Sequence, residues 1–309
     1  MLFAAWRMHP TNLWVSKLSL HPPHCTTNVV PRPRENIRQP SVLAVVHLDF
    51  CPRFLRNACG LDEFHRPIHL DSEETQNTLK GDIYAVVDYP FATVNSAFND
   101  PQQGPANWCE VLILHLNTQY CHATSGANGA IISMNVGKKT EQELGDTFRV
   151  QFNYRSVATS PDYFQVDLSA AEGPLSTKDY RIVLEAVDIG KGHTFLHLTY
   201  SYGFGMAGRL AMKTYLATIG SAKVGFTQTS SGDYIGGVRG LVERNTMRYY
   251  LAIDAYLGSL AIPADKRVDQ RFAAWFDATE QYPRQLHELD RQAYLQMKKN
   301  EYQRQQTAQ

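Results

Sequence analysis

The residues with the clearest chemical pattern lie between positions 203 and 208. Gly203, Gly205 and Gly208 match G-x-G-x-x-G, and such glycines let a dinucleotide pyrophosphate approach a helix N-terminus. The preceding segment alternates apolar and polar residues, whereas a central parallel strand is apolar on both faces. The segments before it are joined by tight turns rather than by crossover helices. This context favours a flexible turn over nucleotide binding, with a gate over a cavity as an alternative role.

Other chemical signatures are incomplete. Residues 137–140 (GKKT) have the order that ends a phosphate-binding loop, but Ile132 stands where the first glycine is required. His21, His24 and Cys25 have metal-ligand side chains, yet no second cluster accompanies them. Neither G-x-S-x-G nor H-E-x-x-H occurs. We therefore predict no catalytic residue, no metal site and no cofactor.

Three histidines, His115, His122 and His197, lie in the part of the chain that we expect to be ordered. His115 shares a helical stripe with Trp108 and Leu112. A histidine on an apolar face is usually a hydrogen-bonded core residue. If His115 faced a cavity, it could instead bind the polar head of a ligand or act as a general base.

The elements that must position these residues include a set of strands. Between Thr147 and Tyr202 apolar and polar residues alternate with a period of two, which predicts strands with one dry face and one wet face. Turn residues between the runs predict sequential antiparallel neighbours. The predicted strands are 81–89, 131–136, 148–157, 163–168, 180–187 and 194–202.

Two short helices are predicted after the first strand, and a long one near the end of the domain. Phe91, Val94 and Phe98 have helical spacing, and Pro105 suits the start of a second short helix. The stretch 238–260 is predicted to be an amphipathic helix. Weaker patterns predict a helix at 206–219 and a hairpin around 230–233.

The ends of the chain differ from its middle. Residues 21–40 are rich in proline, which disfavours both helix and sheet. We therefore predict a disordered or poorly ordered leader at 1–60, a folded domain at 61–262 and a helical extension at 263–309.

The extension has a narrow apolar stripe of Tyr282, Leu286 and Leu289 among many charges. We expect it to pack on the outside of the domain, and the alternative is a helix that binds a protein partner. Its cationic residues, Lys298, Lys299 and Arg304, are predicted to be a solvated helix end.

The overall charge is balanced, with 30 Lys plus Arg and 30 Asp plus Glu among 309 residues. A protein that binds nucleic acid needs a clustered basic surplus, so we predict no nucleic-acid partner. No run of eighteen apolar residues occurs, so no transmembrane helix is expected. The N-terminus is a poor signal peptide. A cytoplasmic location is the default expectation, and a periplasmic protein with a misplaced start codon is the alternative.

The five cysteines are odd in number and include no C-x-x-C pair, which disfavours a zinc ribbon or a thioredoxin-like site. Cys109 and Cys121 flank a predicted helix-to-strand turn. We expect two buried free thiols there. A disulfide in an oxidising compartment is the alternative.

The order of strand, two short helices, strand meander and long helix, over residues 79–260, resembles the START-like (helix-grip, SRPBCC) superfamily. That superfamily includes the pollen-allergen and polyketide-cyclase groups, and the chain looks particularly like a bacterial START-like group. The segments that carry the resemblance are GDIYAVVDYPFATV, WCEVLILHLNTQYC, EGPLSTKDYRIVLEAV, TFLHLTYSY and GLVERNTMRYYLAIDAYL. It implies an α+β helix-grip fold, with a curved antiparallel sheet wrapped around the long helix and a deep cavity for lipids or other apolar molecules. The family has no universal catalytic residues, so none is carried over.

The residues expected to face that cavity are apolar or amphipathic. Each tyrosine offers an apolar ring with a hydroxyl at its tip, although such rings could also simply fill the core. Asn245 is either a hydrogen-bonded core amide or the group that orients a ligand. The predicted ligand-binding residues are Phe152, Tyr154, Phe164, Tyr180, Ile182, Leu198, Tyr200, Tyr202, Asn245, Tyr249 and Ile253.

Three functions follow from these observations. The preferred hypothesis is a non-catalytic carrier or sensor that binds a lipid or another apolar small molecule. The alternative is an enzyme of polyketide cyclase, hydrolase or dehydratase type in the same cavity. Such an enzyme needs two titratable groups close together, for example His115 with a carboxylate. The third hypothesis is an interaction module that uses the C-terminal helix.

Overall fold

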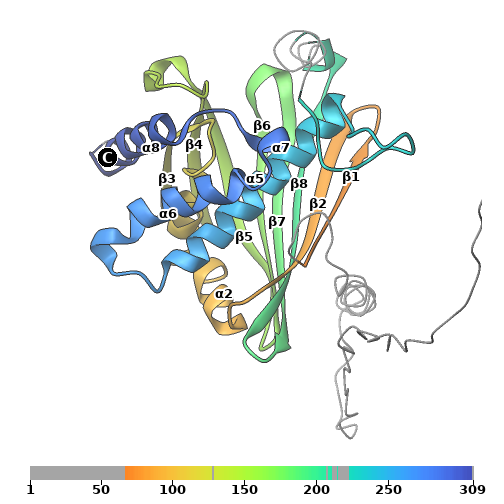
Figure 1. Cartoon of the computed structure of the whole chain (residues 1–309). Helices are drawn as coiled ribbons and strands as arrows, with labels where there is room; N and C mark the ends of the chain where they lie inside the picture. The colour runs from red at the N-terminus through yellow and green to blue at the C-terminus, as the bar shows by residue number, and fades with distance from the viewer. Residues whose placement is uncertain (1–66, 127–128, 207, 211–213, 215–222, 308–309) are drawn as a thin grey trace, which may run out of the picture. The chain divides into compact units, whose positions relative to one another are not determined.

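The period-two segments of the sequence form one antiparallel sheet, which has eight strands in the described part of the chain (Figure 1). The computed structural model describes residues 67–126, 129–206, 208–210, 214 and 223–307. The strand order is β1-β2-β8-β7-β6-β5-β4-β3. The strands are β1 (Ile68–Glu74), β2 (Thr78–Val87), β3 (Thr118–Gly126), β4 (Gly129–Val136), β5 (Phe148–Ser160), β6 (Tyr163–Glu172), β7 (Thr177–Gly190) and β8 (His193–Phe204).

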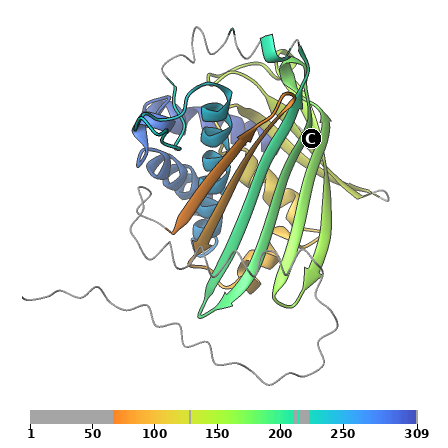
Figure 2. The same ribbon diagram turned by 90° about the vertical axis from the view of Figure 1, so that its right-hand side faces the viewer.

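The helices lie on one side of this sheet (Figure 2). The long helix α5 packs against β1, β2 and β8, with α3 and α6 beside it. This arrangement is the α+β helix-grip fold that the START-like resemblance implied, and the fold prediction is confirmed. The helices are α2 (Phe91–Phe98), α3 (Gly104–Leu112), α5 (Gly237–Ser259), α6 (Ala264–Thr279), α7 (Pro283–Leu286) and α8 (Arg291–Thr307), with short 3-10 turns η1 (Leu144–Asp146) and η2 (Pro174–Ser176).

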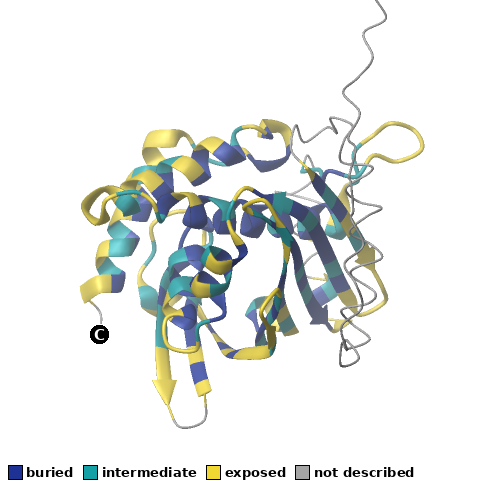
Figure 3. Cartoon of the chain, turned by 90° about the horizontal axis from the view of Figure 1, so that it is seen from below, coloured by how far each residue is buried: buried dark blue, intermediate teal, exposed yellow. Residues whose placement is uncertain are grey.

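The alternation on β5 places its side chains as predicted. Val150, Phe152 and Tyr154 are buried on the helix side, and Gln151 between them is exposed. Phe148, at the start of the strand, is 39% exposed because it lies at the end of the sheet rather than over the core. In Figure 3 the middle of the sheet is buried, whereas the end of β3 and the start of β4 are exposed.

The helix α5 is buried on its polar side as well as on its apolar side, unlike an ordinary amphipathic surface helix. Val242 and Ile253 are fully buried, as expected for its apolar face. Its polar residues Arg244 and Arg248 are each 2% exposed, because the segment after residue 263 covers the outer side of the helix. Trp275 of α6 donates a hydrogen bond from Nε1 to the carbonyl of Arg248, at 3.1 Å.

A single glycine lets α5 lie close to the sheet. A Cβ atom at Gly81 of β2 would overlap with the Thr246 side chain of α5. A larger residue at this position would therefore push the first half of α5 away from the sheet, which is the half that matters for the site described below.

Two strands were not predicted. The sequence of β1, IHLDSEE, ends in charged residues, which are typical of an edge strand and hide its pattern. The strand β3 is rich in small polar residues and follows α3 after a short link, so its alternation is weak. The predicted hairpin near 230–233 is confirmed by pairing of Gln228 with Tyr234. The predicted leader, and most of the predicted helix at 206–219, lie outside the described residues.

Cys109 and Cys121 form a disulfide between α3 and β3. The expectation of two free thiols was therefore wrong. Because β3 folds back directly after α3, the two Cα atoms lie 5.3 Å apart, a separation that disulfides commonly span.

The C-terminal segment packs against the domain through α6 and α8. The prediction that Lys298 belongs to a solvated helix end was wrong, because Lys298 is fully buried beside Glu301. Its Nζ donates to Glu301 at 2.6 Å and to the carbonyls of His115 and Thr118 at 2.7 and 3.0 Å. Lys299, on the neighbouring face, is exposed as expected. The three-segment division of the chain stays a prediction. In the described residues, no helix is both long and apolar enough to cross a membrane.

Candidate functional site

A cavity of about 700 Å³ lies between the first half of α5 and the ends of β4, β5, β7 and β8. This volume is within the usual range of small-molecule sites. Met134, Val136, Val150 and Phe152 provide apolar wall from β4 and β5. Leu175, in η2, lines the cavity and is 67% exposed, which places it at the rim.

The structure brings six of the eleven predicted binding residues to this cavity. Those six are Phe152, Tyr180, Tyr200, Tyr202, Asn245 and Tyr249.

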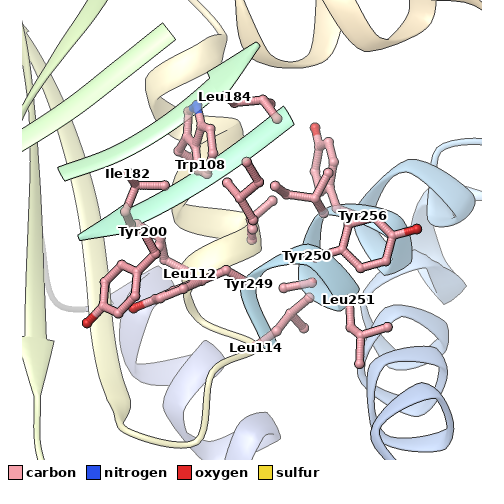
Figure 4. Packing of buried hydrophobic residues seen from close by; sticks show 14 of the residues in the cluster. Trp108, Leu112, Leu114, Ile182, Leu184, Tyr200, Tyr249, Tyr250, Leu251 and Tyr256 are labelled. Carbon is pink, nitrogen blue, oxygen red and sulfur yellow. The ribbon is translucent and has the colours of Figure 1, made fainter. Parts of the chain in front are cut away.

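The other five predicted residues are buried in the core outside the lining. They are Tyr154, Phe164, Ile182, Leu198 and Ile253. The helices α2 and α3 fill the space at that end, so Phe164 contacts Phe91, and Tyr154 donates a hydrogen bond to the Phe98 carbonyl at 2.8 Å. Figure 4 shows Tyr200 of β8 near Tyr249 of α5, and Leu184 of β7 near Trp108 of α3.

Four tyrosines form one wall of the cavity. The rings of Tyr180 and Tyr202 stack at 5.1 Å between centroids, and Tyr200 contacts Tyr249 at 5.1 Å. The Tyr180 hydroxyl lies 2.8 Å from Thr177 Oγ1. Burial raises the pKa of Tyr200 well above its usual value and also raises that of Tyr249, so both stay protonated. Neither of these two hydroxyls has a hydrogen-bond partner among the described residues, which leaves two donors for a ligand.

His115 lies at the cavity, stacked on Tyr249 with ring centroids 5.1 Å apart. Its Nδ1 accepts a hydrogen bond from the backbone N–H of Asn117 at 3.3 Å, so in the neutral ring Nε2 bears the hydrogen. Burial, followed by the charges of Arg248 and Lys298, holds the pKa of His115 well below its usual value. A long hydrogen bond with the Asn245 side chain opposes this shift, and no described residue makes a hydrogen bond of normal geometry to the buried Nε2. His115 is therefore a neutral donor.

One part of the lining is strongly cationic. Glu288 forms ion pairs with four side chains, and we call these five residues the Glu288 cluster. Lys139 Nζ lies 2.7 Å from Glu288 Oε1, and Arg248 Nη2 lies 3.0 Å from the same oxygen. Lys223 and Arg244 pair with the two carboxylate oxygens at close range. All five residues line the cavity.

Several elements of the fold build the Glu288 cluster. Arg244 and Arg248 are one turn apart on α5 and donate to the carbonyls of Gln285 and Leu286, at 2.5 and 3.3 Å. These bonds hold the segment after α7, which carries Glu288.

The loop that carries Lys223 is fixed by a second buried carboxylate. Glu243, fully buried on α5, accepts hydrogen bonds from the backbone N–H groups of Phe226 and Thr227, at 2.6 and 2.9 Å. It also accepts one from Ser72 of β1, at 2.6 Å. This places the loop before α5 against the helix.

The charges in the Glu288 cluster shift two pKa values. Burial alone would raise the pKa of Glu288, but the charges of Arg248 and Lys139 outweigh it and hold that pKa below its usual value. Burial and the charge of Arg248 lower the pKa of Lys139 to about 7, because together they outweigh the opposing effect of Glu288. The single carboxylate is therefore ionised, and the surrounding cations repel one another.

The sequence analysis named no member of the Glu288 cluster as a binding residue, and Lys139 was considered only within the rejected phosphate-loop motif at 137–140. The signal that was present is the pair of arginines spaced by four residues on the helix that also carries Asn245 and Tyr249. Arg248 Nη1 lies 3.5 Å from Asn245 Oδ1, so the amide contacts the cluster directly.

His197 does not belong to the cavity. It lies on the opposite face of the sheet, where Nδ1 is 2.8 Å from Glu185 and Nε2 is 2.9 Å from Asp82. Burial would lower the pKa of His197, but these carboxylates raise it. His122, on β3, is also absent from the lining. In the described part of the chain, no group of His, Cys, Asp and Glu is arranged to hold a metal ion.

The glycine pattern lies at the end of β8. Gly203 pairs with Thr78 of β2 and Lys178 of β7, both antiparallel. The parallel sheet of a dinucleotide-binding fold is therefore not formed around it. A gating role for this segment stays a prediction.

The strand order, the two short helices and the long helix define an α+β protein with the helix-grip fold. No family model and no curated protein matches the chain. Solved structures are similar to it at low identity. An aromatase/cyclase from Streptomyces sp. R1128 is 13% identical, covering 65% of this chain and 96% of that one, with a TM-score of 0.37.

Human StAR-related lipid transfer protein 5 is 8% identical, covering 71% of this chain and 97% of that one, with a TM-score of 0.35. Norcoclaurine synthase from Thalictrum flavum is 14% identical over 46% of this chain and 77% of that one, with a TM-score of 0.32. The fold assignment rests on the topology of the chain itself.

Proposed function

We propose that the cavity binds a lipid or another apolar small molecule and that the protein is a non-catalytic carrier or sensor. The observation that carries the proposal is the cavity of about 700 Å³ with its wall of Tyr180, Tyr200, Tyr202 and Tyr249. A largely apolar cavity with a few convergent polar groups is the usual form of a small-molecule site. The hydroxyls of Tyr200 and Tyr249 and Nε2 of His115 are the convergent donors.

The proposal is tested with a neutral apolar fluorophore, N-phenyl-1-naphthylamine, and a variant that fills the cavity. Val150 lies on β5 with its side chain in the lining. Val150→Trp should weaken binding of the fluorophore about tenfold or more, because the indole occupies the ligand space. The matched control is Gln151→Trp, one residue further along the same strand on its exposed face. Binding is measured by fluorescence titration.

Folding of each variant is checked by thermal unfolding. If Val150→Trp does not fold, Val136→Phe on β4 tests the same space from a half-buried position. Equal binding by the wild type, a folded filling variant and Gln151→Trp would place the fluorophore elsewhere and contradict the proposal.

The alternative of a cyclase or hydrolase in the same cavity is less well supported. It requires two titratable groups close together, and the example that the sequence suggested was His115 with a carboxylate; the described lining contains one carboxylate, Glu288. The ion pairs of Glu288 hold it ionised, and no hydrogen bond joins it to His115. Binding of a protein partner by the C-terminal helix stays a prediction.

A further inference from the structure

We infer that the ligand is an amphipathic anion, whose carboxylate or phosphate head group binds the Glu288 cluster while its apolar part lies against the tyrosine wall. This inference rests on the proposed function and adds the chemical class of the ligand. It starts from the charges of the lining, which differ from those of the chain as a whole.

The lining holds a cationic excess. The chain has a formal net charge of zero, but the described lining has five cationic side chains and one carboxylate. The cations of the Glu288 cluster are joined there by Lys138. Buried charges are normally paired one to one, since an unbalanced buried charge is costly. One carboxylate shared by four cations leaves room for a second anion.

The excess lies within reach of solvent and ligand. Arg244 and Arg248 are almost fully buried, whereas the side chains of Lys139 and Lys223 are 25% and 21% exposed. The two lysines thus lie between solvent and the buried arginines. Guanidinium and ammonium groups together are the usual donors to carboxylate and phosphate oxygens.

The same cavity contains the apolar half of the site. Phe152, Met134 and the tyrosine wall line it together with the Glu288 cluster. A free inorganic anion would leave this apolar surface without a contact, and a purely apolar molecule would leave the excess of cations over the one carboxylate of the lining unbalanced. A molecule with one anionic end and one apolar end satisfies both.

Two polar groups lie between these halves. His115 stacks on Tyr249 of the apolar wall, and the charges of Arg248 and Lys139 act on it. Asn245 contacts Arg248. The Nε2–H of His115, which lies near the Asn245 side chain, can donate a hydrogen bond to a head-group oxygen. The depressed pKa of Lys139 supports the inference, because an anion bound beside it would relieve the repulsion among the cations.

The test compares four probes on the full chain by calorimetric titration at low salt. Oleate and oleoyl lysophosphatidate supply carboxylate and phosphate heads, oleyl alcohol has the same apolar chain without charge, and inorganic phosphate has the charge without the chain. At least one of the two anionic lipids should bind about tenfold or more tightly than both oleyl alcohol and inorganic phosphate. Their ranking identifies the head group.

The variants Lys139→Met and Lys223→Met keep the apolar length of each side chain and remove its charge. Each should weaken binding of the preferred anion about three- to tenfold and leave binding of oleyl alcohol unchanged, with a smaller loss of affinity on adding salt. The matched control is Lys266→Met, on the exposed side of α6 outside the lining, which should change neither. Thermal unfolding confirms that each variant is folded.

The outcomes separate this inference from the proposed function. Equal affinity for oleyl alcohol and the anions would overturn the inference and leave the apolar cavity intact as a binding site. Equal binding of inorganic phosphate and the lipids would also overturn it, because the apolar part would then contribute nothing. A chain that bound none of the lipids would overturn both proposals.

Discussion

The C-terminal segment contributes to two buried ion clusters that differ in their balance of charge. On α8, Lys298 and Glu301 are both fully buried, one cation beside one carboxylate, and two backbone carbonyls accept the remaining donors of Lys298. Ahead of α8, Glu288 forms ion pairs with four cations in the lining of a cavity. The first cluster, which we call the matched pair, has equal numbers of cations and carboxylates and is closed to solvent. The second, the unmatched Glu288 cluster, has an excess of cations and lines a cavity.

The difference separates a structural use of buried charge from a binding use. Lys298 holds the link between α3 and β3 by its carbonyls, and this link carries His115. All three donors of Lys298 are used within the protein, so we assign this pair a structural role alone. The Glu288 cluster has four cations to one carboxylate, and it lies beside the apolar lining of the cavity. An excess of one charge in such a place is a feature of functional sites.

The largest expected effect comes from breaking the matched pair. Lys298→Met should destabilise the protein by about 3–5 kcal/mol, because Glu301 would be left buried without its cation. The measurement is urea unfolding. The neighbouring Lys299→Met, which removes an exposed ion pair with Asp269, should change stability by about 0.5 kcal/mol or less. A similar small effect for both would show that Lys298 is not held in the closed cluster.

The disulfide joins α3 to β3, the two elements whose connection Lys298 contacts. The backbone N–H of Cys121 donates to Gln305 of α8 at 3.2 Å. The disulfide and α8 therefore both hold β3 in place. Replacing both Cys109 and Cys121 by alanine should lower stability by about 2–3 kcal/mol, given the 12-residue separation. Thiol counting on the denatured wild type, with and without reductant, must show two thiols that appear only on reduction; if their number does not change, the pairing is absent.

A smaller effect is expected at the unmatched cluster. Glu288→Gln should destabilise the protein by roughly 1–3 kcal/mol, since the half-exposed lysines can turn toward water when the carboxylate is removed. Sulfate should raise the free energy of unfolding of this variant more than that of the wild type, because the anion can replace the missing carboxylate among the cations. Asp277→Asn, which removes an exposed partner of Arg291, serves as the control for general salt effects. Equal stabilisation of all three proteins would argue against an excess of cations.

The smallest effect is a pH dependence from Lys139. Its folded pKa of about 7 lies below the unfolded value of 10.5, so between these values the unfolded chain binds more protons and stability rises with pH. The groups that face it are Arg248, Lys223 and Glu288. Denaturation between pH 6.5 and 9 should show this rise in the wild type and less of it in Lys139→Met. The same slope in both would assign the effect to another group.

The sequence predicted the fold better than the site. Strand alternation and the two proline-started helices depend on local spacing, which the sequence displays directly, as on β5 from Val150 to Tyr154. The aromatic residues Tyr200 and Tyr249 were named for the cavity on the same grounds. Whether they bind a ligand stays a prediction.

The rest depended on contacts between distant segments. Glu288 and Arg244 are separated by more than forty positions, and no local pattern shows that they meet. Lys298 looked like a surface residue because the carbonyls of His115 and Thr118, which accept its hydrogen bonds, come close only when α8 packs on β3. Likewise, Ile182 and Phe164 have the pattern of cavity residues, but α2 and α3 fill the space beside them.

The most direct test of this account is to offer the full chain a mixed lipid extract, wash it and identify what it retains by native mass spectrometry followed by organic extraction. The account predicts a stoichiometric single molecule with one anionic head group and an apolar body, lost in Val150→Trp and reduced in Lys139→Met. Retention of neutral lipids alone, or of nothing, would contradict it.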